Sequence, residues 1–178
     1  MEIRNSRIIV GSAGGTAGRT SKTYKISLPS AWLSQMEIGE EEREVLISFD
    51  GNQITIRKML SFSDFIEKKK QMGHDLKLFR FFDGESLCTS IAADFTDQTV
   101  SIKNEKVSVA SLAFGRKENP SWEDLVEFLE ERCIPRQRDG IRYYLEELGL
   151  DEYDPFEIVL KTEGRMAEDG QWMKVEDL

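Results

Sequence analysis

The chain has 178 residues, of which 32% are charged and 39% are hydrophobic, and its 33 acidic residues outnumber its 24 Lys and Arg residues to give a net charge of −9. This composition predicts one or two folded domains and excludes a chain that is disordered throughout. No segment approaches the roughly 20 apolar residues that span a bilayer, and the first residues lack the apolar stretch of a signal peptide. We therefore expect no membrane partner and a cytoplasmic location.

The sequence offers few groups for catalysis or metal binding. Cys88 and Cys133 fit no zinc spacing and make no disulfide framework. His74 is the only histidine, which excludes a His-rich site, and we expect it at the surface rather than in a site. Cys133, between Arg132 and Pro135, could be a reactive thiol, but without a local histidine we favour a packed side chain. We predict no cofactor, no metal and no catalytic residue.

Charge is distributed unevenly along the chain. Residues 1–36 contain five Lys or Arg residues and one acidic residue, whereas residues 84–178 contain 11 basic and 22 acidic residues. The basic N-terminal region favours contact with a polyanion. Screening confines each charge to about 8–10 Å, so the overall acidity does not prevent a local basic surface from binding nucleic acid. Charge alone leaves open that these cations are merely solvated.

The N-terminal third predicts short strands around one short helix. Residues 7–10 are expected as a strand, residues 11–21 as a loop rich in Gly, Ser and Thr, and residues 24–28, which alternate in polarity, as a second strand. Pro29 suits the first turn of a helix over residues 31–36. Residues 45–49 and 53–57 are expected as strands, joined at Asp50-Gly51-Asn52, which is a strong hairpin signal.

The glycine-rich loop does not match a nucleotide-binding motif. A Walker A sequence requires Gly, four residues and then Gly-Lys-Ser/Thr, but this chain has Ala13 and Arg19 where Gly and Lys are needed. Residues 11–18 do not fit the dinucleotide fingerprint either. The sequence therefore argues against nucleotide binding.

The order of these parts resembles the AbrB/MazE/SpoVT swapped-hairpin DNA-binding domain over about residues 5–59. The matching segments are residues 25–33 (KISLPSAWL), 38–40 (IGE), 45–47 (VLI) and 50–57 (DGNQITIR). The resemblance implies a dimer that exchanges strands to close a small barrel, and DNA contacts on the first strand, its loop and the run before Leu28-Pro29. Carried over to this chain, those contacts are Arg7, Arg19, Thr20, Ser21, Lys22 and Lys25, to which we add Arg4 on charge alone.

Physical arguments support a dimer independently of the resemblance. Two hairpins and one helical turn bury too little apolar surface to stand alone. In a two-fold dimer the charges of the N-terminal regions would add, and Lys and Arg side chains could contact phosphates while Arg reads guanine edges. Two-fold symmetry would imply a palindromic or pseudo-palindromic double-stranded DNA operator.

The middle of the chain predicts a helix followed by strands. A helix is expected over residues 61–72, opened by Ser61 or Ser63, with Lys68-Lys69-Lys70 solvated at its end. Strands are expected at residues 77–83, 87–95 and 98–103, whereas residues 106–114 are ambiguous. We interpret residues 60–83 as a connecting helix and strand, and residues 84–178 as a separate acidic domain.

Three short amphipathic helices are predicted after Pro120. Ser121 with Asp124 indicates a capping box for the first helix, and the second carries apolar residues over 141–148 with Gly149 after it. The third begins at residues 154–155 and is expected to end at Gly164. These helices would form a compact bundle or cover a small sheet.

The acidic domain is expected to bind a protein rather than DNA. Arg136, Arg138 and Arg142 could serve a helix-turn-helix, but the surrounding carboxylates would repel phosphates. Aromatic and arginine side chains supply most interface energy, and the expected partner-binding residues are Trp122, Arg136, Tyr153 and Trp172. Residues 132–136, 149–155 and 164–169 are similar to segments of small proteins found beside HipA-like kinase toxins, within a resemblance over about residues 84–173. That resemblance implies a cognate toxin as partner.

The sequence therefore predicts an α+β chain with an N-terminal swapped-hairpin β-barrel, dimeric over residues 1–59, and a small mixed domain with a three-helix C-terminal part. The expected function is that of a homodimeric DNA-binding transcriptional regulator, an antitoxin-like repressor. The alternative is a protein-interaction adaptor that uses the N-terminal domain only to dimerise. An enzyme using carboxylates such as Glu168 and Asp169 ranks last, because no nucleophile or ligand cluster frames them.

Overall fold

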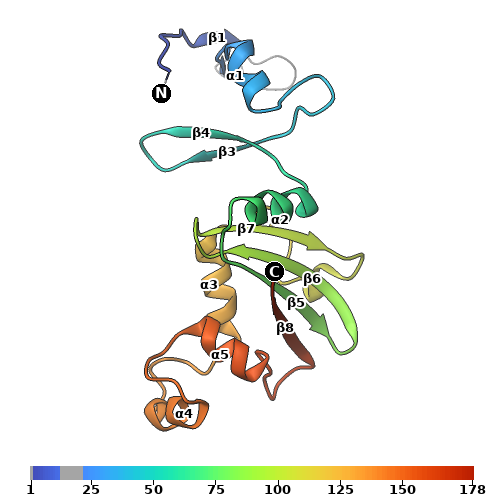
Figure 1. Ribbon diagram of the computed structural model, residues 1–178, viewed down its shortest axis with the longest axis vertical. Coiled ribbons are helices and arrows are strands. Elements are labelled where there is room, and N and C mark those ends of the chain that lie inside the picture. The colour runs from blue at the N-terminus through green and yellow to red at the C-terminus, as the bar shows by residue number, and fades with distance from the viewer. Residues whose placement is uncertain (1, 13–21) are drawn as a thin grey trace. The chain divides into compact units, whose positions relative to one another are not determined.

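The computed structural model describes residues 2–12 and 22–178 (Figure 1). The chain has a mixed α+β fold in which the strands pair antiparallel. Internal contacts divide it into two compact units, Met1–Met59 and Leu60–Leu178.

The first unit consists of two hairpins and a short helix. Strand β1 (Ile9–Ser12) pairs with β2 (Lys22–Lys25), and β3 (Val45–Phe49) pairs with β4 (Ile54–Lys58). Helix α1 (Ser30–Gln35) lies between the hairpins in sequence and follows Pro29. The β3–β4 turn forms as predicted, because Asp50 accepts hydrogen bonds from the backbone N–H groups of Asn52 and Gln53, both at 2.9 Å, and Gly51 adopts a φ of 95°. The two hairpins are separate two-stranded sheets, so the described part of one chain contains no closed barrel.

The second unit is built on a four-stranded sheet with the order β7-β6-β5-β8. Its strands are β5 (Leu76–Asp83), β6 (Ser86–Asp94), β7 (Thr99–Asn104) and β8 (Gln171–Asp177). Strand β8 was not predicted from the sequence. It pairs along β5, with Phe81 opposite Met173, and such a non-local contact leaves no signal in local periodicity.

Helices cover both faces of this sheet (Figure 1). Alternate residues of a strand point to opposite faces, and α2 (Phe62–Gln71) packs its Phe65 against Leu76 and Ala92 on one face. The main core lies on the other face, where Phe79 and Phe81 of β5 meet α3 (Trp122–Glu131), α4 (Ile141–Leu148) and α5 (Pro155–Thr162). The fully buried side chains of this core include Ile91, Leu125, Leu129, Ile158, Val159 and Met173.

Local sequence signals account for the ends of these helices. The predicted capping box of α3 is confirmed, because the Ser121 hydroxyl accepts from the Asp124 N–H at 3.2 Å and the Asp124 carboxylate accepts from the Ser121 N–H at 2.7 Å. Helix α4 ends before Gly149, which has the left-handed conformation (φ 69°). Helix α5 ends at Thr162, earlier than predicted, because Glu163 already adopts a φ of 56°. A short 3₁₀ helix, η1 (Val109–Ser111), occupies part of the segment that was ambiguous in sequence.

Residues 60–83 do not form the connection that the sequence suggested. They supply α2 and β5, and β5 lies between β6 and β8 inside the second unit. Phe79 and Phe81 are 1% and 2% exposed. The domain expected to begin at residue 84 would lack this strand and its core side chains, so the boundary falls before residue 60. Among the described residues, no helix has the length and apolar character needed to cross a membrane.

Candidate functional site

The predicted DNA-binding cations lie at the surface wherever the structure describes them. Arg4, Arg7, Lys22 and Lys25 are all exposed. Lys22 and Lys25 are three residues apart on β2, so they point to opposite faces of the β1–β2 hairpin. Arg4 lies 3.5 Å from Glu2 and its guanidinium lies 5.6 Å from the centre of the Trp32 ring. The remaining predicted contacts, Arg19, Thr20 and Ser21, lie outside the described residues.

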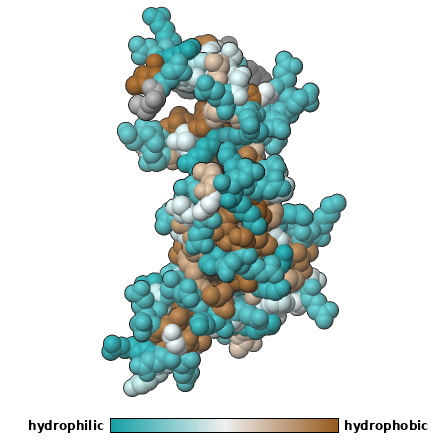
Figure 2. All heavy atoms as spheres, viewed as in Figure 1, coloured by the Kyte–Doolittle hydropathy of each residue, from teal (hydrophilic) through white to brown (hydrophobic). Residues whose placement is uncertain are grey.

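The first unit has apolar side chains at its surface instead of a core. None of its described residues is buried, and Figure 2 shows apolar side chains at the surface of this unit. In the β3–β4 register, Ile47 lies opposite Ile56 and Phe49 lies opposite Ile54. Together with Val45 these residues form one apolar face, on which Ile47, Phe49 and Ile54 are 62%, 69% and 67% exposed. Folded alone, this hairpin would leave that face in water.

Trp122, a predicted partner-binding residue, is half-buried and packs against neighbouring aromatic side chains. Its ring stacks on Phe156 with centroids 5.3 Å apart and meets Phe95 edge-on at 5.1 Å. These contacts place Trp122 at the margin of the main core. Part of its aromatic area therefore stabilises the unit itself.

Trp172 lies on β8 within a three-layer stack. Its ring stacks on Phe82 with centroids 4.5 Å apart, and the Arg165 guanidinium lies 4.7 Å from its centre. Its Nε1 donates a hydrogen bond to the carbonyl of Gly84 at 2.8 Å. This side chain is half-buried, and its hydrogen bond ties β8 to the turn between β5 and β6.

Arg136 and Tyr153, two of the predicted partner-binding residues, are adjacent in the structure. The Arg136 guanidinium lies 4.6 Å from the centre of the Tyr153 ring. The Tyr153 hydroxyl donates to the carbonyl of Ile134 at 3.0 Å, and burial raises its pKa to about 12. Both residues line a shallow hollow beside the C-terminal end of α3, with Glu127, Glu130 and Glu131 on the helix side.

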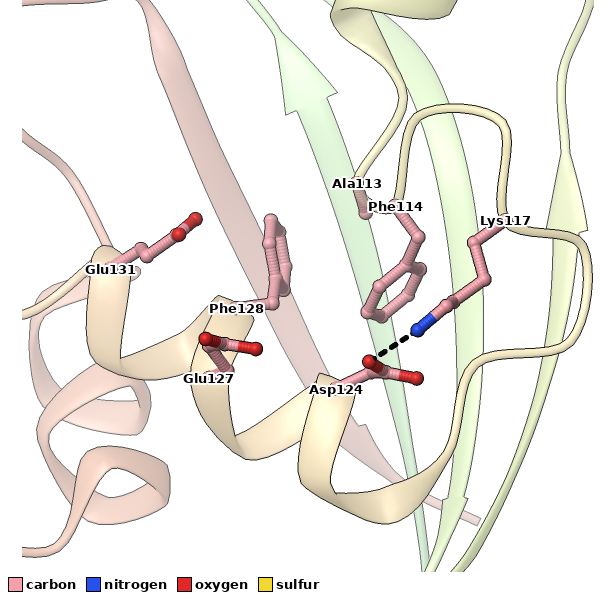
Figure 3. A pocket seen from close by; sticks show the side chains of 7 residues that line it. All are labelled: Ala113, Phe114, Lys117, Asp124, Glu127, Phe128 and Glu131. Carbon is pink, nitrogen blue, oxygen red and sulfur yellow. Dashed lines mark hydrogen bonds and ion pairs between the residues drawn. The ribbon is translucent and has the colours of Figure 1, made fainter.

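A second hollow lies on the same helix toward its N-terminal end (Figure 3). Phe114 and Phe128 form its floor, with ring centroids 5.2 Å apart. Lys117 closes one side by an ion pair to Asp124 at 2.6 Å. Glu127 and Glu131 line both hollows. This surface was not predicted from the sequence, although the sequence shows the acidic residues of the helix, among them Glu127 and Glu131.

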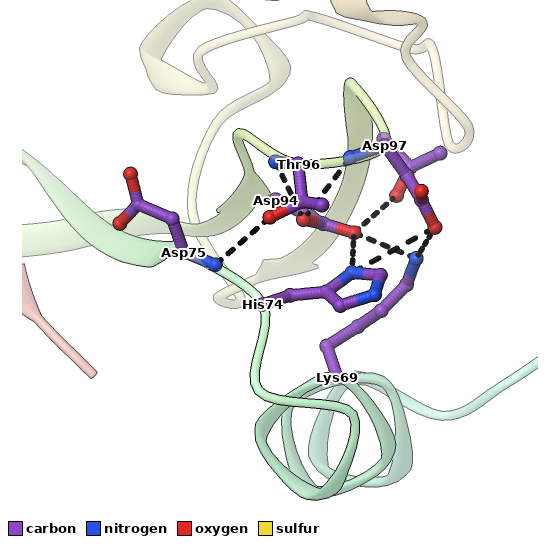
Figure 4. A network of polar contacts seen from close by, with 7 residues as sticks. Lys69, His74, Asp75, Asp94, Thr96 and Asp97 are labelled. Atoms are coloured by element: carbon purple, nitrogen blue, oxygen red, sulfur yellow. Dashed lines mark hydrogen bonds and ion pairs between the residues drawn. The ribbon is translucent and has the colours of Figure 1, made fainter.

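His74 belongs to a buried polar cluster rather than to the surface, contrary to the prediction (Figure 4). Its Nδ1 lies 2.9 Å from a carboxylate oxygen of Asp94, whose side chain is fully buried. The Lys69 ammonium lies 2.6 Å from Asp94 and 2.6 Å from Asp97. Helix α2, the turn before β5 and the end of β6 each supply part of this cluster, which only the fold brings together.

Each charged group within this cluster has an oppositely charged partner from the chain itself. Burial acts to raise the pKa of Asp94, but hydrogen bonds from Lys69, His74 and the backbone N–H groups of Thr96 and Asp97 lower it to about 2. Burial also acts to lower the pKa of Lys69, and its two carboxylate partners outweigh this and raise it. His74, Asp94 and Asp97 have ligand atoms close enough to hold a cation. The Lys69 ammonium already contacts both carboxylates, so the cluster anchors α2 to the sheet.

The remaining candidates for chemistry have structural partners. Cys133 is buried, and burial raises its pKa to about 12, so its thiol is protonated at neutral pH. Asp169 accepts two hydrogen bonds from the guanidinium of Arg132, at 2.6 and 2.9 Å. Arg132 also donates to the carbonyl of Gly164 at 3.0 Å. Asp169 is therefore engaged in holding the segment between α5 and β8.

Comparisons with known proteins add no assignment. A scan against protein-family models, a search of curated proteins and a search of solved structures found no match.

Proposed function

We propose that this protein is a homodimeric DNA-binding regulator, an antitoxin-like repressor whose N-terminal units pair through their hairpins and whose acidic second unit binds a partner protein, such as a cognate toxin. Repression requires occupancy of an operator and no catalysis. The observation that carries this proposal is the apolar face of β3–β4 in a unit that has no buried residue among those described.

A second copy is the occupant that best fits this apolar face. Full burial of a large apolar side chain contributes about 1.5–3 kcal/mol, and this face offers Ile47, Phe49, Ile54 and Ile56 together. A two-stranded hairpin is marginal by itself, and closing two copies into a barrel removes both the apolar face and the open strand edges. The resemblance of residues 5–59 to swapped-hairpin domains supports the same arrangement.

The basic residues of the same unit fit a DNA backbone. The cations of the N-terminal region lie at the surface where they are described, and pairing two copies doubles the excess of five basic over one acidic residue in residues 1–36. Phosphate contacts by Lys and Arg supply affinity that falls with salt. Residues 84–178, in which acidic residues outnumber basic ones, are unsuited to contact with phosphates. We therefore assign this segment to a protein partner.

A pair of matched substitutions in β3 tests the dimer and its link to DNA binding. Ile47→Asp puts a charge on the apolar face, whereas Ser48→Asp puts the same charge on the opposite face of the same strand. Sedimentation equilibrium should show a dimer for the wild type and for Ser48→Asp, and a monomer for Ile47→Asp. A monomeric wild type would refute the proposal.

Electrophoretic shift of the DNA upstream of the protein's own gene tests the interface. Lys22→Glu with Lys25→Glu should weaken binding at every sequence and reduce the salt dependence, by about one unit of log–log slope for each phosphate that the variant no longer neutralises. Lys106→Glu is the control, because it reverses an exposed cation of the second unit. A dimer that shifts no DNA at low salt would instead favour the adaptor function.

A further inference from the structure

We propose that the outward side of α3 is a docking groove for an arginine-bearing segment of a partner protein. The groove consists of the two hollows described above, which share Glu127 and Glu131, and Phe114 and Phe128 line the hollow nearer the N-terminal end of α3. This inference deepens the proposed function, because it rests on the assignment of a protein partner to the second unit. It names the surface of the second unit that the partner occupies and the chemistry that the partner brings.

The groove has an apolar floor under an acidic rim (Figure 3). Phe114 is half-buried and Phe128 is 8% exposed, and their rings are in contact. Glu127 and Glu131 are exposed and stand one helical turn apart above this floor. A side chain that occupies the groove therefore contacts aromatic carbon at the floor and carboxylate oxygen at the rim.

Cations of the chain itself already occupy the two ends of the groove. Lys117 contacts Asp124 at the N-terminal end of α3, and Arg136 contacts Glu130 at 3.4 Å near its C-terminal end. Within the part of the chain that the structure describes, neither Glu127 nor Glu131 has an ion-pair partner. The ion pairs of Asp124 and Glu130 show that carboxylates of α3 bind cations. Glu127 and Glu131 can bind further cations in the same way.

The charges in the C-terminal half of α3 are unfavourable. Glu127 and Glu131 are like charges at i and i+4, which destabilises a helix. Glu130 and Glu131 lie in the last turn, where the helix dipole favours cations, and this turn has no basic residue. A cation supplied by a partner relieves both conflicts, so charge complementarity selects a basic segment over an acidic or purely apolar one.

Arginine fits the groove better than a compact cation. Its aliphatic stem can cover Phe114 and Phe128 while its guanidinium reaches the rim. The chain contains a local example of this recognition, because the Arg136 guanidinium stacks over Tyr153 while it contacts Glu130. The expected occupant is a segment whose arginine side chains project along one side.

A fluorescence anisotropy titration of the full-length protein tests this groove. The probe is a labelled synthetic peptide of alternating Arg and Ala residues, and a peptide of alternating Glu and Ala residues serves as the negative probe. Glu127→Gln with Glu131→Gln should weaken binding of the Arg peptide by about fivefold. Glu146→Gln with Glu147→Gln removes the same charge from exposed positions of α4 and should leave the affinity within about twofold.

Each outcome decides for or against the groove. Equal weakening by both double variants would overturn it, because attraction would then come from the acidic unit as a whole. No binding of the Arg peptide to the wild type, or equal binding of the Glu peptide, would overturn it too. Loss of self-association in the Glu127→Gln/Glu131→Gln variant would assign the groove to a second copy instead.

The DNA shift assay separates this inference from the proposed function. Both double variants should shift DNA like the wild type, because the substitutions lie outside residues 1–59. If the wild type shifts no DNA but the peptide still distinguishes the two double variants, the groove stands and the regulator proposal fails. If the wild type shifts DNA but the Arg peptide binds both double variants equally, only the groove proposal is refuted.

Discussion

Replacing Lys69 with Met should weaken the attachment of α2 to the sheet, because Lys69 is the cation that pairs with Asp94. The Lys69 ammonium is 2.6 Å from Asp94 and from Asp97, and the Asp94 side chain has no exposed surface. Removing one partner of a buried ion pair leaves an uncompensated charge, which typically costs about 3–5 kcal/mol. Asp94 keeps the hydrogen bonds from His74 and the backbone, so we expect a loss of about 2–3 kcal/mol in the free energy of unfolding of the second unit.

The lowered pKa of Asp94 reflects the combined effect of Lys69, His74 and the backbone N–H groups that contact its carboxylate. Its pKa is lowered from 3.8 to about 2 in the folded chain, which corresponds to about 2 kcal/mol at neutral pH. Because the folded pKa lies below the unfolded one, this stabilisation is present above about pH 4 and is lost as the pH falls toward 2. Asp94→Asn should therefore flatten the pH dependence of stability within that window.

Urea unfolding measures both effects. In a Trp32→Phe background the remaining tryptophans, Trp122 and Trp172, both report on the second unit. Lys70→Met is the control, because it removes a neighbouring exposed cation from the same last turn of α2. Coincident unfolding midpoints for Lys69→Met and Lys70→Met would refute the role given to this cluster.

Three further predictions concern the packing of the second unit. Gly164→Ala should destabilise it by about 1–3 kcal/mol in urea unfolding, because Gly164 has a φ of 59° and an added Cβ would lie 2.7 Å from Cε of the buried Met173. Arg132→Met should lower the thermal unfolding midpoint by removing the donor that Asp169 and the Gly164 carbonyl share, and an unchanged midpoint would contradict this clamp. Iodoacetamide should modify Cys133 at neutral pH only when denaturant opens the fold, as followed by mass spectrometry, and rapid labelling of the native protein would contradict a thiol whose pKa is about 12.

The features that could be predicted from sequence are those that depend on neighbours within one or two turns. The capping box at Ser121, the end of α4 at Gly149 and the hairpin at Asp50-Gly51 each arise from contacts a few residues apart. The amphipathic pattern of β3 and β4 and the excess of cations in residues 1–36 are likewise present in the chain before it folds. These local properties lead to the DNA-binding and dimerisation hypothesis.

Contacts between distant segments were decided only by the tertiary structure. Strand β8 pairs with β5 across the length of the second unit, and this pairing places β5 inside the sheet, between β6 and β8. The same fold packs Trp122 at the margin of the core and brings Lys69 and His74 to Asp94. Periodicity indicates which side of a helix or strand is apolar. It does not indicate which other element packs against that side, because for these residues that element lies far away in the chain.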